Sequence, residues 1–266
     1  MSTYKRLDRI GAMGGKKVDV QDTPFTMTVT TTGAATLTFQ GMTVAAGKSV
    51  VVDWGDGNKD TYTAGAGTRT HAYAGAGVWI VKLANRRNIT LLDLEDTKIT
   101  SLIINSTNPL PTGLTSLYLI SLAGLTYNAN TNPLPTGLTS LYLISLAGLT
   151  WIINASQPWP TGATGAVITG CPNVICTAWT DNAIRSIQAE NAYSQANVDA
   201  FINAIWANKA NFTYATPTLD LLGGGNAAPS GTYQSATPPT TGKEKAYDLV
   251  NGSYTPAGPE WVVQTA

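Results

Sequence analysis

Apolar residues follow two different periods along the chain, and the first is a period of two. Between residues 25 and 83, short alternating runs are separated by turns rich in Gly, Ala and Thr: FTMTV, TLTF, SVVVDW, KDTYT and VWIVKL. Alternation of this kind is typical of half-buried β-strands. The spacing predicts a small antiparallel β-sandwich over residues 25–86.

From residue 89 the apolar period changes to LxxLxL. Successive sets are Ile89, Leu92, Leu94; Ile99, Leu102, Ile104; Leu114, Leu117, Leu119, Leu122, Leu125; and Leu138, Leu141, Leu143, Leu146, Leu149. Weaker copies follow at Ala163, Ala166, Ile168, Cys171, Val174 and at Ile184, Ile187, Ala189, Ala192. This pattern predicts a solenoid of short parallel strands over residues 87–193, with the apolar side chains pointing inward.

One stretch of the chain occurs twice without change. NPLPTGLTSLYLISLAGLT fills residues 108–126 and again 132–150, 24 positions later. A tandem copy favours a stacked structural unit over an active site, because neighbouring coils bury each other's apolar faces. The NPLPTG segments are expected to form the extended or turn-like return path of each coil.

Residues 194–266 are expected to form a cap of helices and strands. Ser194 is a candidate N-cap for a helix in which Val198, Phe201, Ile202, Ile205 and Trp206 recur on one face. TLDLL then predicts a strand, GKEKAYDLVN a short helix and EWVVQT a final strand. Such a cap would shield the leucines of the last coil from water. The predicted fold class is therefore mainly β with minor α.

The first 24 residues show no apolar period and carry five basic side chains, at Lys5, Arg6, Arg9, Lys16 and Lys17. Two interpretations stay open for this arm. It is either a disordered terminus or a tether that binds an acidic neighbour in an assembly.

Composition argues against nucleic acid as a partner and against a membrane span. The formal net charge is zero and only 12% of residues are charged, so no basic field is available to hold nucleic acid. The start of the chain lacks the apolar core of a signal peptide, and no apolar run is long enough for a membrane span.

Two groups of polar residues invite a chemical interpretation in the first half of the chain. Asp53, Asp56 and Asp60 could bind calcium, although a tight turn at Asp56 with Asp53 bonded to backbone amides is the favoured interpretation. His71 is the only histidine and is expected to be packed or turn-bonding rather than a ligand or base.

Catalysis is not expected. Asp93, Glu95 and Asp96 are the densest acidic cluster, and we expect these carboxylates to be solvated rather than paired for glycoside hydrolysis. Cys171 and Cys176 are expected to be buried reduced thiols, and no metal or cofactor is predicted.

The residues between the leucines predict an outward strip on the solenoid. It consists of Ile103, Tyr118, Tyr142, Val167 and Gln188, flanked by Thr115, Ser116, Thr139 and Ser140. Uncharged aromatic and hydroxyl surfaces suit a glycan or another protein, so this strip is the candidate binding surface. A merely soluble sheet face is the alternative.

Two motifs carry a resemblance to known domains. VVDWGDG (51–57) followed by THAYAGAGVWIVKL (70–83) resembles the polycystic-kidney-disease type of immunoglobulin-like domain, which implies a spacer or adhesive sandwich. The LxxLxL coils resemble leucine-rich repeats. In that family an Asn usually follows LxxLxLxx. Here Leu122, Leu146 and Cys171 occupy this position, and Thr97 and Thr107 occupy it in the early coils.

The closing segments NVDAFI, TLDLLGGGNAAPSG, GKEKAYDLV and WVV resemble the C-terminal end of leucine-rich-repeat proteins of tailed bacteriophages and prophages, with the insertion TYQSATPPTT as a departure. The resemblance implies a non-enzymatic virion structural protein, assembled in the host cytoplasm and displayed on the tail or head. Other virion proteins, host-surface glycans or proteins, and further copies of the chain are the implied partners. A bacterial cell-surface adhesin of the same modules is the alternative.

Overall fold

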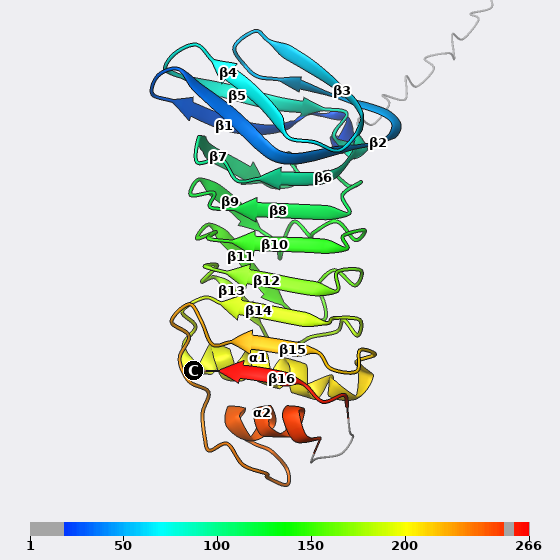
Figure 1. Cartoon of the computed structure of the whole chain (residues 1–266), viewed down its shortest axis with the longest axis vertical. Helices are drawn as coiled ribbons and strands as arrows, with labels where there is room; N and C mark the ends of the chain where they lie inside the picture. The colour runs from blue at the N-terminus through cyan, green and yellow to red at the C-terminus, as the bar shows by residue number, and fades with distance from the viewer. Residues whose placement is uncertain (1–18, 253–257, 266) are drawn as a thin grey trace, which may run out of the picture.

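The computed structural model describes residues 19–252 and 258–265, which form an elongated stack of β-strands closed by two α-helices at the C-terminal end (Figure 1). The N-terminal strands are β1 (Phe25–Thr31), β2 (Ala35–Asp53), β3 (Lys59–Gly65), β4 (Arg69–Tyr73) and β5 (Gly77–Ala84). The stack continues through β6 (Ile89–Leu94), β7 (Ile99–Ile104), β8 (Ser116–Ile120), β9 (Leu125–Asn128), β10 (Ser140–Ile144), β11 (Leu149–Ile153), β12 (Gly165–Thr169), β13 (Val174–Cys176) and β14 (Ser186–Glu190). The chain ends with α1 (Gln195–Ala207), β15 (Thr218–Leu221), α2 (Gly242–Asn251) and β16 (Val262–Thr265).

The LxxLxL segments form the parallel strands predicted for them. In one sheet β6, β8, β10, β12, β14, β15 and β16 lie side by side in this order, all parallel. The two identical segments pair residue for residue, with Ser116 opposite Ser140 and Ile120 opposite Ile144. The weaker copy follows in phase, because Ala166 pairs with Leu141.

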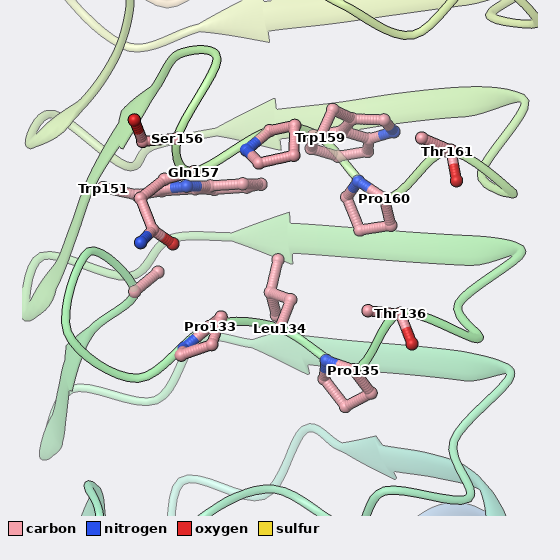
Figure 2. Close-up of a pocket in the computed structure, with 12 residues that line it drawn as sticks. Pro133, Leu134, Pro135, Thr136, Trp151, Ser156, Gln157, Trp159, Pro160 and Thr161 are labelled. Carbon is pink, nitrogen blue, oxygen red and sulfur yellow. The ribbon is translucent and has the colours of Figure 1, made fainter.

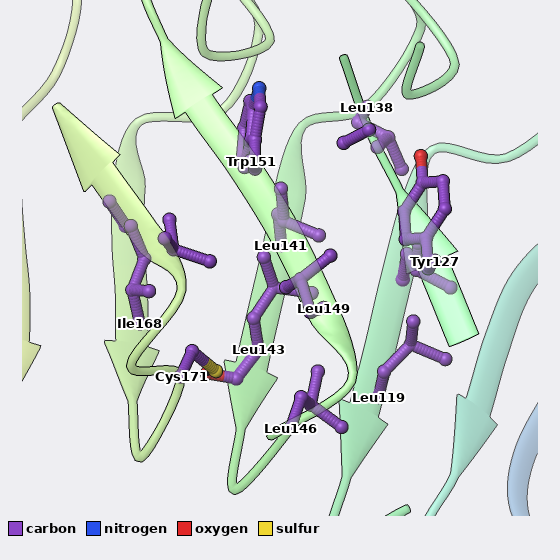
Figure 3. Close-up of a cluster of buried hydrophobic side chains, with 14 of the residues drawn as sticks. Leu119, Tyr127, Leu138, Leu141, Leu143, Leu146, Leu149, Trp151, Ile168 and Cys171 are labelled. Carbon is purple, nitrogen blue, oxygen red and sulfur yellow. Dashed lines mark hydrogen bonds between the residues drawn. The ribbon is translucent and has the colours of Figure 1, made fainter. Parts of the chain in front are cut away.

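A second parallel sheet, formed by β7, β9, β11 and β13, lies on the other side of the stack. The leucine pattern predicted β7 as a strand but not its place in this sheet, and it did not predict β9, β11 and β13 as separate strands. Directly after the first strand of a coil, Ser121, Ser145 and Gly170 adopt left-handed backbone conformations, with φ of 55°, 55° and 66°. This sharp turn sends the chain into the second strand, and the leucines of both strands fill the space between the sheets (Figure 3).

Two glycines permit neighbouring coils to approach closely. A Cβ added at Gly124 would overlap the carbonyl oxygen of Thr100, and one at Gly148 would overlap that of Leu125. Both glycines precede the second strand of a coil and belong to the duplicated segment. The backbone contact between coils therefore requires glycine at this step of the repeat.

The N-terminal strands join the two solenoid sheets at the top of the stack. β1 pairs antiparallel with β7, β2 pairs antiparallel with β6, and β5 lies between β1 and β2. The result is a mixed sheet, and a separate immunoglobulin-like sandwich is not shown. TLTF and the first five residues of SVVVDW, expected as separate strands, belong to the single 19-residue strand β2, because residues 41–44 between them pair with β6.

Residues 19–23 of the expected arm are packed on the first return loop. Gln21 is buried, and its side chain donates to the carbonyl of Leu110 and accepts from the amide of Thr112. The buried Arg86 donates to the carbonyls of Val20 and Pro109. The five basic residues of the arm, Lys5, Arg6, Arg9, Lys16 and Lys17, lie outside the described residues.

The C-terminal cap has the predicted elements. Ser194 caps α1 by accepting from the amide of Asn197, and Val198, Phe201, Ile202 and Ile205 are buried under the last coils. On α2, the buried Asp248 accepts from the indole of Trp206 at 2.6 Å and from the ammonium of Lys209. These bonds fix α2 to the end of α1. No helix among residues 19–252 and 258–265 is long and apolar enough to cross a membrane.

Candidate binding surface

Four of the five predicted strip residues lie next to one another. Tyr118 on β8, Tyr142 on β10, Val167 on β12 and Gln188 on β14 are direct partners across the parallel strands. Their neighbours Leu117, Leu141, Ala166 and Ile187 are buried, so the strip residues point away from the core. The structure thus brings these four together as one outward ladder.

Ile103 does not belong to this ladder. It lies on β7 in the opposite sheet, where it pairs with Thr126 and is 49% exposed. Asp93 on β6 occupies the expected place beside Tyr118. Placing Ile103 beside Tyr118 was therefore wrong, because the first coil contains two LxxLxL sets and the second of them turns into the other sheet.

The two tyrosines form the aromatic part of the ladder. Their rings stack with centroids 4.8 Å apart and planes 16° from parallel. The Tyr118 hydroxyl lies 2.9 Å from the Ser140 hydroxyl, in the next coil. Because Tyr118 is held on one face by Tyr142 and at its tip by Ser140, the more exposed Tyr142 presents a positioned ring to solvent.

The lower part of the ladder is aliphatic and polar. Val167 is half-buried, and the Gln188 side-chain amide donates to the Glu190 carboxylate at 2.8 Å. At the upper end, burial raises the pKa of Asp93, and the nearby Glu95 adds to that effect. Along the ladder itself, Tyr118 and Tyr142 are therefore uncharged, with the carboxyl group of Asp93 above them and that of Glu190 below them.

The predicted return loops enclose grooves, a second surface feature that the sequence did not predict. Two grooves lie between successive loops, of about 660 Å³ and about 230 Å³, and both include Pro133, Leu134, Pro135 and Thr136. The smaller groove is backed by the stacked rings of Trp151 and Trp159, whose centroids are 5.5 Å apart (Figure 2). The recurring P-L-P and P-W-P triplets were the available signal, since each places an apolar residue at the same point of successive coils.

The acidic turn near residue 54 is a hydrogen-bonded turn. Asp53 accepts from the Gly55 amide at 3.0 Å, as the favoured interpretation required, and Asp60 accepts from the Trp54 indole at 2.7 Å. Burial acts to raise the pKa of Asp56, but hydrogen bonds from His71 and from Asn58 outweigh it and keep the pKa lowered. The three carboxylates are thus bonded to different partners, and no group of three metal-ligating side chains occurs among the described residues.

His71 is packed, as expected. Its ring stacks on the buried Trp54 with centroids 4.9 Å apart, and its Nε2 lies 2.8 Å from Asp56 Oδ2. The Tyr73 ring makes an edge contact with the His71 ring, with centroids 4.7 Å apart, and the Tyr73 hydroxyl donates to the Trp54 carbonyl. The motif residues therefore form one packed cluster around Trp54.

The second acidic cluster is only partly solvated. Glu95 is exposed, but Asp96 is buried and accepts from the amides of Thr38 and Lys98 at 2.8 Å and 2.9 Å. Asp93 is half-buried. The expectation that all three are solvated was therefore wrong, because Asp96 ties the turn after β6 to β2.

Two asparagines supply the coil-to-coil bonds that the leucine positions lack. Asn191 accepts from the Cys171 amide at 2.6 Å and donates to the Ile168 carbonyl at 2.7 Å. Asn226 does the same one coil further, donating to the carbonyls of Ala189 and Leu221. Sequence reasoning missed both, because they do not fall in phase with Leu122 and Leu146.

The cysteines are free and buried, as expected. Burial raises the pKa of Cys171 to about 11 and raises that of Cys176 further. Both thiols are therefore protonated at neutral pH and act as small core residues.

Comparisons of the chain with protein-family models, with curated proteins and with solved structures give no match.

Proposed function

We propose that the chain is a non-enzymatic structural protein of a bacteriophage virion, displayed on the tail or head, whose solenoid face contacts a protein or a glycan. The observation that carries the recognition role is the stacked pair Tyr118 and Tyr142 at the neutral centre of the outward ladder. Aromatic rings with hydroxyl neighbours are common at contact surfaces because they combine apolar area with hydrogen-bonding groups.

The finer fold assignment belongs to the same proposal. We infer that residues 25–86 are a polycystic-kidney-disease-like domain merged with the stack, and that the coils are leucine-rich repeats. The packed Trp54 cluster supports the first inference, since the residues of both motifs meet there. The in-phase inward leucines support the second.

The virion role is supported by the resemblance of the C-terminal segments to phage repeat proteins. A bacterial surface adhesin built from the same modules is the alternative.

The test is immunogold labelling and cryo-electron microscopy of purified particles from the phage that encodes the chain. Antibodies against the purified protein should label intact particles, and density for the solenoid should project from the surface. Unlabelled particles would refute the virion role, and recovery of the native protein in a bacterial envelope fraction would then support the adhesin.

A further inference from the structure

A hollow on the ladder face lies beside the Tyr142 ring. The outward row two residues before the tyrosines contains Ser116, Ser140, Gly165, Ser186 and Thr218 on successive strands. Gly165 is the member of this row without a side chain. The space above it is a cavity of about 220 Å³ lined by Ser140, Tyr142, Thr164, Arg185 and Ser186, among others.

The walls of the hollow differ in chemistry. On one side Tyr142 is 37% exposed, and its ring is held by the stack on Tyr118. Ser140 and Ser186 provide hydroxyls that can donate or accept. An apolar ring face beside hydroxyls matches a pyranose sugar, which has an apolar C–H face and hydroxyls around its edge.

Arg185 adds a positive charge to the lining of the hollow. It is exposed, and it is the charged residue among the described residues that line the hollow. Its guanidinium carbon lies 5.2 Å from the centre of the Tyr214 ring, which orients the group. None of the ion pairs within the described parts of the chain involves Arg185. A guanidinium without a carboxylate partner suits bidentate binding of a ligand carboxylate.

We infer that this hollow binds one ring of an acidic sugar, a uronic or sialic acid, within a longer glycan. The sugar ring lies against Tyr142, its hydroxyls bond Ser140 and Ser186, and its carboxylate pairs with Arg185. The inference rests on the proposed role of the solenoid face as a recognition surface, and it names the class of ligand.

The test uses the full chain and two pairs of probes, trigalacturonic acid with its methyl ester and sialyllactose with its methyl ester, so that the members of a pair differ in the charge of the carboxyl group. Isothermal titration calorimetry should show the acid binding at least about tenfold more tightly than the neutral partner, the usual weight of a hydrogen bond to a charged group. The preference should weaken in high salt, because the pair is exposed.

Three variants locate the binding. Gly165→Ser introduces the serine found in neighbouring coils, and an added Cβ meets nothing closer than Ser186 Oγ at 3.4 Å, so the variant should fold normally while its side chain occupies the part of the hollow between Ser140 and Ser186. Arg185→Gln should remove the preference for the acid, and Tyr142→Ala should weaken both members of a pair. Lys82→Gln, which removes an exposed positive charge on β5, is the matched control and should bind as the wild type.

The outcomes separate this inference from the proposed function. Equal binding of acid and ester, or an unchanged preference in Arg185→Gln, would overturn the acidic-sugar inference whether or not particles are labelled. Undiminished binding by folded Gly165→Ser would overturn the location. Unlabelled particles with intact, Arg185-dependent binding would refute the virion role and leave the site standing.

Discussion

The duplicated coils and the coils below them differ in how each coil contacts its neighbour. In β8 to β11, the turn after each first strand is followed by a buried leucine, Leu122 or Leu146, and the coils touch through glycine. Below β12, buried Asn191 and Asn226 bond the backbone of adjacent coils instead. The contact between the duplicated coils therefore depends on apolar packing and on the absence of a Cβ at one step, whereas the contact between the lower coils depends on buried side-chain hydrogen bonds.

Replacing Gly148 by Ala should produce the largest effect. The new methyl group would overlap the Leu125 carbonyl, and relief requires two coils to separate. We expect a loss of about 3 kcal/mol or more in the free energy of unfolding, as for severe overpacking. Urea unfolding followed by circular dichroism measures the change.

Gly137→Ala is the matched control for that variant. Gly137 lies in the same identical segment, but an added Cβ there would sit 3.4 Å from the Leu114 carbonyl. Its loss should stay below about 1 kcal/mol. Equal losses in the two variants would contradict the proposed role of close coil contact.

Asn226→Leu should have the next largest effect. It gives the lower coils a buried leucine, as in the duplicated coils, in place of a hydrogen-bonding asparagine. The variant leaves the amides of Asn191 and Tyr193 and the carbonyls of Ala189 and Leu221 without their side-chain partner. Each buried group left unpaired costs about 1–3 kcal/mol, and burial of the new leucine side chain offsets part of the total, so a net loss of about 2–3 kcal/mol is expected. Hydrogen exchange of the Asn191 and Tyr193 amides should quicken while amides of β8 and β10 stay protected, which a global effect would not produce.

The sequence predicted most of the stack because inward positions repeat along it. The leucine period located β8, β10 and β12, and Ser194 located the start of α1. The second strands were missed because Leu125 and Leu149 were counted with the leucines of the preceding set, although each begins a new alternating run, such as Leu149, Trp151 and Ile153 in β11. The left-handed serine that creates them has no strong sequence signal, since serine rarely adopts that conformation.

The candidate site was predictable only where register is set by the repeat. Tyr118 and Tyr142 occupy identical positions in the duplicated segment, so their contact followed from the period. Ile103 was misplaced because local spacing does not tell which sheet a strand joins. The hollow at Gly165 depends on Arg185 approaching from a coil whose step is 21 residues rather than 24 or 25, as the pairing of Ala166 with Ile187 shows.

Ser145→Gly should produce the smallest effect, and in the opposite direction. Ser145 is exposed with φ of 55°, and the next coil has Gly170 at this step with φ of 66°. Glycine removes about 1–2 kcal/mol of left-handed strain but adds about 0.5–1 kcal/mol of unfolded-chain entropy, so a net gain of about 0.5 kcal/mol is expected. Ser116→Gly, in an extended strand, gives no such relief and should lose stability. If parallel urea titrations showed both variants destabilised alike, the left-handed serine would not be strained, and the serine turn of the duplicated coils would be equivalent to the glycine turn below.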